Sequence, residues 1–140
     1  MKRALVVLVG LMSLVSGCSG SSLRTVTVQY DVRDGLWENL PNGECHRPII
    51  GVEEGQTVTL TGPDGVLLGA AGVSNGTVVD VDSADIYDYE GEVCRFEFTF
   101  LDIPEVATYL FATQGGPDFP VIPLDFVKAD GWALLLNSGY

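Results

Sequence analysis

The chain has 140 residues, 46% of them hydrophobic, and its 19 acidic against seven basic residues give a formal net charge of −12. Non-specific nucleic-acid binding depends on Lys and Arg neutralising phosphates, so this balance excludes nucleic acid as a partner. The length suits a single domain with one hydrophobic core. The excess of carboxylates predicts a solvated acidic surface, with binding of a cation or a basic partner as the alternative.

The N-terminus has the layout of a secretory signal. Lys2 and Arg3 precede a mostly apolar run over residues 4–15, and small residues follow it. A membrane-spanning helix needs about 20 apolar residues, and this run is too short to be one.

The segment Val15-Ser16-Gly17-Cys18 at the end of this run resembles the lipobox of bacterial lipoprotein precursors. The resemblance implies that the Cys18 sulfur receives a diacylglyceryl group and that the preceding residues are removed. No other cofactor is expected. Two acyl chains hold a protein stably to a bilayer, so the expected location is extracytoplasmic, anchored to the cell membrane.

We therefore expect a signal peptide over residues 1–17, a lipidated tether over residues 18–24 and a single domain over residues 25–140. Removing the signal leaves five basic residues against 19 acidic ones, a formal charge of −14.

Two cysteines remain in the mature chain, Cys45 and Cys94. In an exported protein such a pair predicts a structural disulfide. A metal or redox role is disfavoured because no CxxC spacing occurs and His46 is the only histidine.

Period-two alternation of apolar and polar side chains predicts strands along most of the domain. Gly62-Pro63-Asp64-Gly65 predicts a hairpin turn, and Asn75-Gly76 predicts a turn before the next strand. Cys94 shares a face with alternating phenylalanines, which places its partner Cys45 in or beside the core. The expected strands cover residues 26–32, 57–61, 66–68, 77–81, 94–100, 106–113 and 132–136.

Only residues 123–130 look helical, with a proline suited to the start and a glycine suited to the residue after the end. The expected fold is therefore all-β: a small antiparallel β-sandwich, immunoglobulin-like or similar, with one disulfide and one short helix near the C-terminus.

Residues 34–50 lack periodicity and predict a long loop pinned by Cys45. Within it, Leu36, Trp37 and Leu40 have two interpretations. They form an exposed partner-binding loop, or they fold down and cap one end of the sandwich.

An acidic segment over residues 80–92 holds six carboxylates. Extracellular modules bind calcium through such oxygen ligands, which makes a weak calcium site of Asp80, Asp82, Asp85 and Asp88. The spacing is not that of an EF-hand, and the preferred interpretation is a solvated acidic loop.

No catalytic residues are predicted. Residues 72–76 match the G-x-S-x-G pattern, but that motif requires a strand-to-helix elbow and a later histidine, and His46 comes earlier. The protein is therefore expected not to be an enzyme.

The body of the chain is similar to small lipoproteins of actinobacteria and their phages, a group mostly without assigned activity. The similarity follows the C-x-F-x-F strand that begins at Cys94, then Pro104, a strand with Tyr109 and the terminal Gly131-Trp132. It covers most of the mature chain, although this chain lacks the group's usual basic residues before the helix.

These features predict a membrane-anchored, non-enzymatic binding module at the cell surface, with a protein or small-molecule partner. The alternatives are a prophage-encoded lipoprotein that excludes superinfecting phages and an envelope module dependent on divalent cations.

Overall fold

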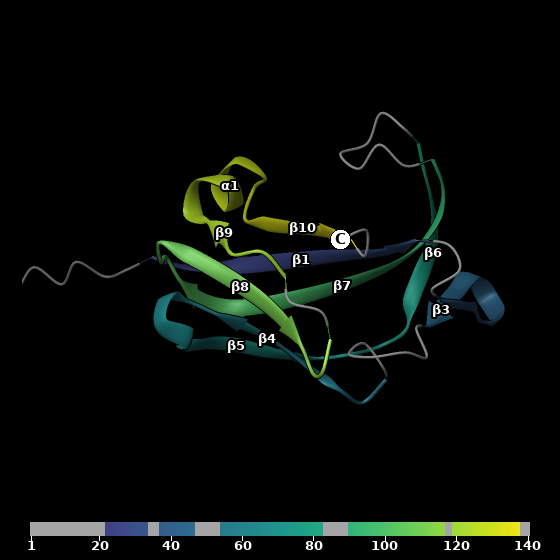
Figure 1. Ribbon diagram of the computed structural model, residues 1–140, viewed down its shortest axis with the longest axis horizontal. Helices are drawn as coiled ribbons and strands as arrows, with labels where there is room; N and C mark the ends of the chain where they lie inside the picture. The colour runs from purple at the N-terminus through teal and green to yellow at the C-terminus, as the bar shows by residue number, and fades with distance from the viewer. Residues whose placement is uncertain (1–21, 34–36, 47–53, 83–89, 117–118, 138–140) are drawn as a thin grey trace, which may run out of the picture.

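The computed structural model describes residues 22–33, 37–46, 54–82, 90–116 and 119–137. These residues form a β-sandwich of two sheets with one short helix (Figure 1). The larger sheet contains, in spatial order, β10 (Ala133–Asn137), β1 (Leu23–Arg33), β7 (Gly91–Pro104), β6 (Gly76–Val81), β3 (Glu44–His46) and β2 (Glu38–Asn39). The smaller sheet contains β5 (Leu67–Gly72), β4 (Thr57–Thr61), β8 (Thr108–Thr113) and β9 (Ile122–Pro123). The predicted all-β sandwich is confirmed.

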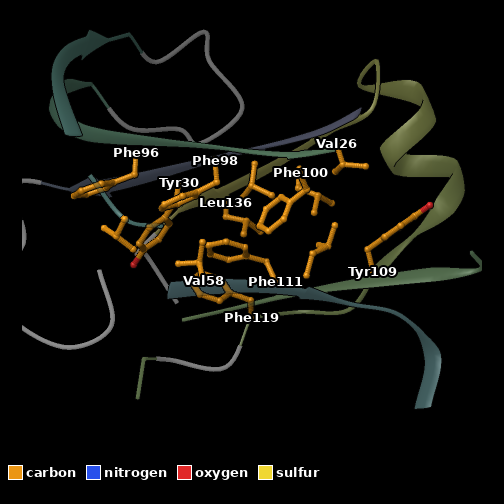
Figure 2. Close-up of a cluster of buried hydrophobic side chains, with 14 of the residues drawn as sticks. Val26, Tyr30, Val58, Phe96, Phe98, Phe100, Tyr109, Phe111, Phe119 and Leu136 are labelled. Atoms are coloured by element: carbon orange, nitrogen blue, oxygen red, sulfur yellow. The ribbon is translucent and has the colours of Figure 1, made fainter. Parts of the chain in front are cut away.

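The antiparallel pair β1 and β7 is the centre of the larger sheet. Their alternating sequences place every second side chain on the inner face, where Val28 lies opposite Phe98 and Tyr30 opposite Phe96. Figure 2 shows the phenylalanines of β7 pointing toward the smaller sheet, and the rings of Phe98 and Phe111 lie 5.4 Å apart. Each fully buried side chain of this size contributes about 1.5–3 kcal/mol to folding.

The smaller sheet is built on the predicted hairpin between β4 and β5. Residues Pro63–Gly65 form a 3-10 turn in which Asp64 and Gly65 have φ of 60° and 73°. Val58 and Leu60 of β4 are completely buried, because the apolar face of this strand covers the core.

The C-terminal strand β10 differs from the otherwise antiparallel pattern. It pairs with β1 in parallel, at the edge of the larger sheet. The helix α1 (Leu124–Ala129) precedes it and begins one residue later than predicted, since Ile122 and Pro123 pair with β8. A parallel partner requires a crossover connection, and α1 lies within that connection.

One expectation needs correction. The segment predicted as a long loop contains β2, β3 and a 3-10 turn over Pro41–Gly43, which extend the larger sheet next to β6. A strand, β6, follows Asn75 as predicted, and β5 and β6 belong to different sheets. The chain crosses between the two sheets here.

Candidate functional site

The sandwich has two distinct ends, at the left and right of Figure 1. We call the first the N-terminal end: β1 begins here at Leu23 opposite Pro104 of β7, next to the start of β8, the β4–β5 turn and α1. We call the second the disulfide end: β1 finishes here at Arg33 opposite Val93, and β2, β3 and the start of β6 lie beside it. Each predicted site residue that the structure describes belongs to one of these regions.

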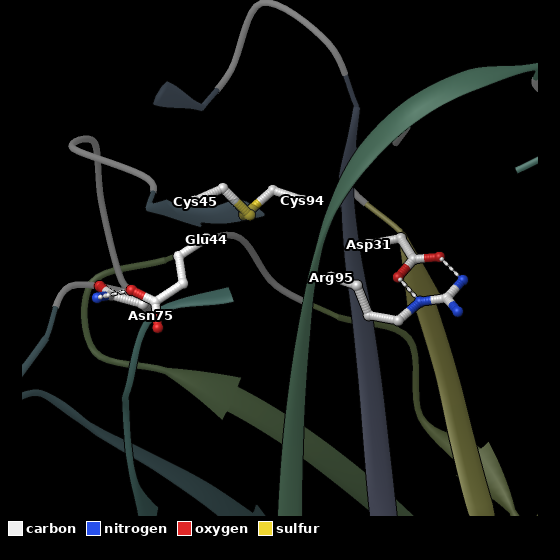
Figure 3. The surroundings of a disulfide bond; sticks show 6 residues. All are labelled: Asp31, Glu44, Cys45, Asn75, Cys94 and Arg95. Carbon is white, nitrogen blue, oxygen red and sulfur yellow. Dashed lines mark hydrogen bonds and ion pairs between the residues drawn. A yellow bond between two sulfur atoms is a disulfide. The ribbon is translucent and has the colours of Figure 1, made fainter. Parts of the chain in front are cut away.

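The predicted disulfide is present at the disulfide end, between Cys45 of β3 and Cys94 of β7 (Figure 3). The two Cα atoms are 5.9 Å apart, and both cysteines are completely buried, as their place on the phenylalanine face predicted. The bridge closes a sequence separation of 49 residues. The chain-entropy model assigns about 4 kcal/mol of stabilisation to a loop of this length.

Gly76 is packed directly against this disulfide. A Cβ atom at this position would lie 2.7 Å from Sγ of Cys94, 2.9 Å from the carbonyl oxygen of Arg95 and 3.2 Å from Sγ of Cys45. Glycine is therefore required at the start of β6 by the close approach of the disulfide. Sequence reasoning attributed this glycine to a turn.

The loop residues proposed for partner binding fall on the same end. Trp37 is half-buried and packs against the hydrophobic core, and Leu40 is half-buried just before the 3-10 turn. Leu36 lies outside the described residues. Nε1 of Trp37 is buried without a hydrogen-bond partner. The contact with the core is the one expected for a cap on the sandwich, and partner binding by this loop stays a prediction.

Polar contacts stabilise the short strands around the disulfide. Nε2 of His46 lies 3.5 Å from Oε2 of Glu38, across the β2–β3 pair. Nδ2 of Asn75 donates a hydrogen bond of 3.4 Å to Oε2 of Glu44 (Figure 3). These contacts are partly or fully exposed, so each contributes little to stability, about 0–1 kcal/mol.

The acidic segment is only partly described. Asp80 and Asp82 are exposed, and Asp80 lies opposite Glu92 in the β6–β7 register. Asp85 and Asp88 lie outside the described residues. Among the residues that the structure describes, no group of three or more His, Cys, Asp or Glu side chains is arranged to hold a metal ion.

Ser74 of the G-x-S-x-G match is exposed between β5 and β6. The chain continues from it directly into a strand, so the strand-to-helix elbow that the hydrolase motif requires does not occur there.

The N-terminal end carries a cluster that sequence reasoning did not find. Its centre is Glu105, in the turn between β7 and β8. Oε2 of Glu105 accepts a hydrogen bond of 3.2 Å from the Ser22 hydroxyl and lies 4.0 Å from Nε of Arg24, while Oε1 pairs with Nζ of Lys128 on α1. The cluster fastens the start of β1 to the β7–β8 turn and to the helix.

Lys128 is the main cause of the lowered pKa of the Glu105 carboxyl. Its hydrogen bond and positive charge, with smaller effects from Ser22 and Arg24, hold the pKa of Glu105 below its ordinary value of 4.5. The same two cations lie near Trp132, with the Arg24 guanidinium carbon 5.0 Å and Lys128 Nζ 5.9 Å from the ring centroid. Only the folded chain brings these residues together, since they come from both ends of the sequence.

Cys18, the predicted lipidation site, lies outside the described residues, whereas β1 begins at Leu23, within the segment assigned to the tether. In the part of the chain that the structure describes, no helix is long and apolar enough to cross a membrane. The chain matches no protein-family model, no curated protein and no solved structure.

Proposed function

We propose that this chain is a lipid-anchored extracytoplasmic protein that acts as a non-enzymatic binding module at the cell surface. The lipobox-like segment ending at Cys18 supports the anchor. The buried Cys45–Cys94 disulfide supports an extracytoplasmic location, because such bonds persist in oxidising compartments.

The observation that carries the proposal is the position of β1 in the fold. Its first residue, Leu23, is five positions after Cys18 and lies at the N-terminal end of the sandwich. A flexible link of five residues spans about 12 Å. A lipid on Cys18 would therefore hold the N-terminal end close to the bilayer and direct the disulfide end away from it.

The disulfide end is the surface that we assign to partner binding. Its short strands are fixed by the disulfide, which keeps the surface preorganised and lowers the entropy lost on binding. Its exposed carboxylates give it negative charge, which favours a basic protein surface and speeds encounter with it. The exposed acidic residues described at this end include Glu38, Glu44, Asp80, Asp82, Glu90 and Glu92.

The proposal is tested by crosslinking and affinity capture from the native host. The wild-type chain is compared with Cys18→Ala and with a disulfide-end variant, Glu38→Gln/Glu44→Gln/Asp80→Asn. A matched control, Asp64→Asn/Asp125→Asn/Asp130→Asn, removes three exposed carboxylates at the N-terminal end instead.

We expect one specific partner with the wild type and with the control variant, and loss of that partner with the disulfide-end variant. Cys18→Ala is expected to carry no lipid, which its intact mass verifies. Capture that is unchanged by the disulfide-end variant would contradict the assigned surface, and a wild-type chain whose mass equals that of an unlipidated chain would contradict the anchor.

A further inference from the structure

We propose that the N-terminal end of the sandwich docks on the lipid bilayer through exposed apolar side chains, so that the domain is held upright on the membrane rather than swinging on its tether. This inference rests on the lipid anchor of the proposed function and adds a second contact with the same membrane.

The described residues include six large apolar side chains that are strongly exposed, and all six lie in or directly beside elements at the N-terminal end. They are Leu23 at 56% exposure, Val66 at 59%, Leu67 at 62%, Leu101 at 68%, Val121 at 57% and Phe126 at 65%. Single exposed apolar residues are common on any protein surface. Six gathered at one end, with none on the described part of the disulfide end, mark an interaction surface.

The strand register connects these residues. Leu23 is opposite Pro104, the last residue of β7, and Leu101 lies three positions before it. The β4–β5 turn reaches the same end, because a Cβ atom on Gly69 would touch Ile103 at 3.0 Å and Phe100 at 3.1 Å. This places Val66 and Leu67 close to the end of β7.

Helix α1 completes the surface on the other side of β1. The amide of Leu124 bonds to the carbonyl of Ala107 in the β7–β8 turn, and the amide of Trp132 bonds to the carbonyl of Val127. Val127 faces the core and is fully buried, whereas Phe126 is exposed. In Figure 1 the start of β1, the start of β8, the β4–β5 hairpin and α1 all reach the left side of the molecule.

The length of the tether identifies the occupant as lipid. An anchor on Cys18 would leave only about 12 Å of chain before Leu23, so the apolar end would remain within reach of the bilayer at all times. The contact between Ser22 and Glu105 shortens the free part of this link further. A second copy of the chain would have to reach the same end while the anchor holds that end against the membrane.

The polar residues at this end fit a membrane interface. Arg24 and Lys128, two of the four basic residues in the described chain, lie beside the half-buried Trp132. Tryptophan is enriched at the headgroup level, and long basic side chains extend toward the headgroups from apolar surroundings. Exposed carboxylates at Asp64, Asp102, Asp125 and Asp130 offset these two charges. Docking is therefore driven by apolar insertion and does not require anionic lipid.

The two tryptophans of the chain provide built-in probes, since Trp132 belongs to the N-terminal end and Trp37 to the disulfide end. The full chain is produced in a bacterial host that processes lipoproteins, and its lipid is verified by intact mass. It is then reconstituted in phosphatidylcholine vesicles with or without brominated acyl chains, which quench nearby indole fluorescence. Trp37→Phe isolates the signal of Trp132, and Trp132→Phe isolates that of Trp37.

We expect bromine to quench Trp132 and to leave Trp37 unaffected, with no loss of quenching at high salt. The variant Leu67→Ser/Leu101→Ser/Phe126→Ser, made in the Trp37→Phe background, is expected to lose most of this quenching while it keeps its lipid. Its three sites are exposed, so the fold is expected to survive, which circular dichroism verifies.

The outcomes separate the docking from the anchor. A lipidated chain whose Trp132 is not quenched, or is quenched equally in the serine variant, overturns the docking and leaves the anchor standing. If the quenching disappears on dilution and the chains also crosslink to one another, the docking is overturned in favour of self-association. A mature chain without lipid overturns the proposed function, and the docking with it.

Discussion

Arg95 donates two hydrogen bonds of 2.9 Å to the two carboxylate oxygens of Asp31, its direct neighbour across the β1–β7 pair (Figure 3). Asp31 is 1% exposed. A buried carboxylate requires a partner, and the planar guanidinium matches both oxygens at once. The ion pair therefore joins the two central strands directly across their register.

Replacing Arg95 with methionine is expected to lower the free energy of unfolding by about 3–5 kcal/mol, because Asp31 would be left as a buried charge. Replacing both residues, as Asp31→Leu/Arg95→Met, is expected to recover much of the loss. Urea unfolding measures both values. Arg24→Met is the control, since its pair with Glu105 is 4.0 Å long and partly exposed, and a much smaller loss is expected. Equal losses in the two single variants would contradict the role of the Asp31–Arg95 pair.

Gly76→Ala is expected to destabilise the protein by about 1–3 kcal/mol, because the new methyl group would overlap Sγ of Cys94 and the carbonyl of Arg95. Gly72→Ala is the matched control at the other end of the same connection, where a Cβ atom would meet nothing within 4 Å. Thermal unfolding of both variants measures the difference. A Gly76→Ala chain as stable as Gly72→Ala would refute the close packing on the disulfide.

The fully buried Tyr109 holds the β7–β8 turn through its hydroxyl, which donates to the carbonyl of Pro104 at 3.1 Å and accepts from the amide of Val106 at 3.2 Å. Tyr109→Phe keeps the ring and removes both bonds. We expect a loss of about 1–3 kcal/mol in urea unfolding, since backbone groups lose their partner. Unfolding that coincides with the wild type would show that the turn does not depend on the hydroxyl.

The Glu105 cluster predicts a pH-dependent contribution to stability. The folded-state pKa of Glu105 lies below 4.5, so its stabilisation is present above that pH and is lost as the pH falls through the lower, folded-state value. The difference in Tm between wild type and Glu105→Gln should therefore be largest near neutral pH and shrink in acid. High salt should also reduce it at neutral pH, because the cluster is half-exposed. A difference that grows on acidification would contradict this linkage.

The sequence predicted those parts of the fold that depend on local patterns. Alternation located the Phe96–Phe100 strand and its buried face, the Gly and Pro spacing located the β4–β5 turn, and Cys94 on the apolar face placed the disulfide in the core. The parallel pairing of β10 with β1 was not predictable in this way, since pairing partners far apart in the sequence leave no local signal.

The same limit applies to the candidate site. Ser22, Glu105 and Lys128 are ordinary exposed residue types in the sequence, and only the sandwich brings them to one end. The sequence marked Gly76 as a turn residue. Glycine is required there because the position contacts a disulfide formed by residues elsewhere in the chain. Asp31 follows the alternating pattern as an outward-facing residue, and its burial depends on tertiary packing.

The most direct test of the account is the intact mass of the mature protein, purified from the membranes of a bacterial host under non-reducing conditions. The proposed anchor and the disulfide predict a chain that begins at Cys18, carries a diacylglyceryl group on that residue and lacks thiol hydrogens on Cys45 and Cys94. A chain that retains residues 1–17, or that has an unmodified thiol at Cys18, would contradict the anchor.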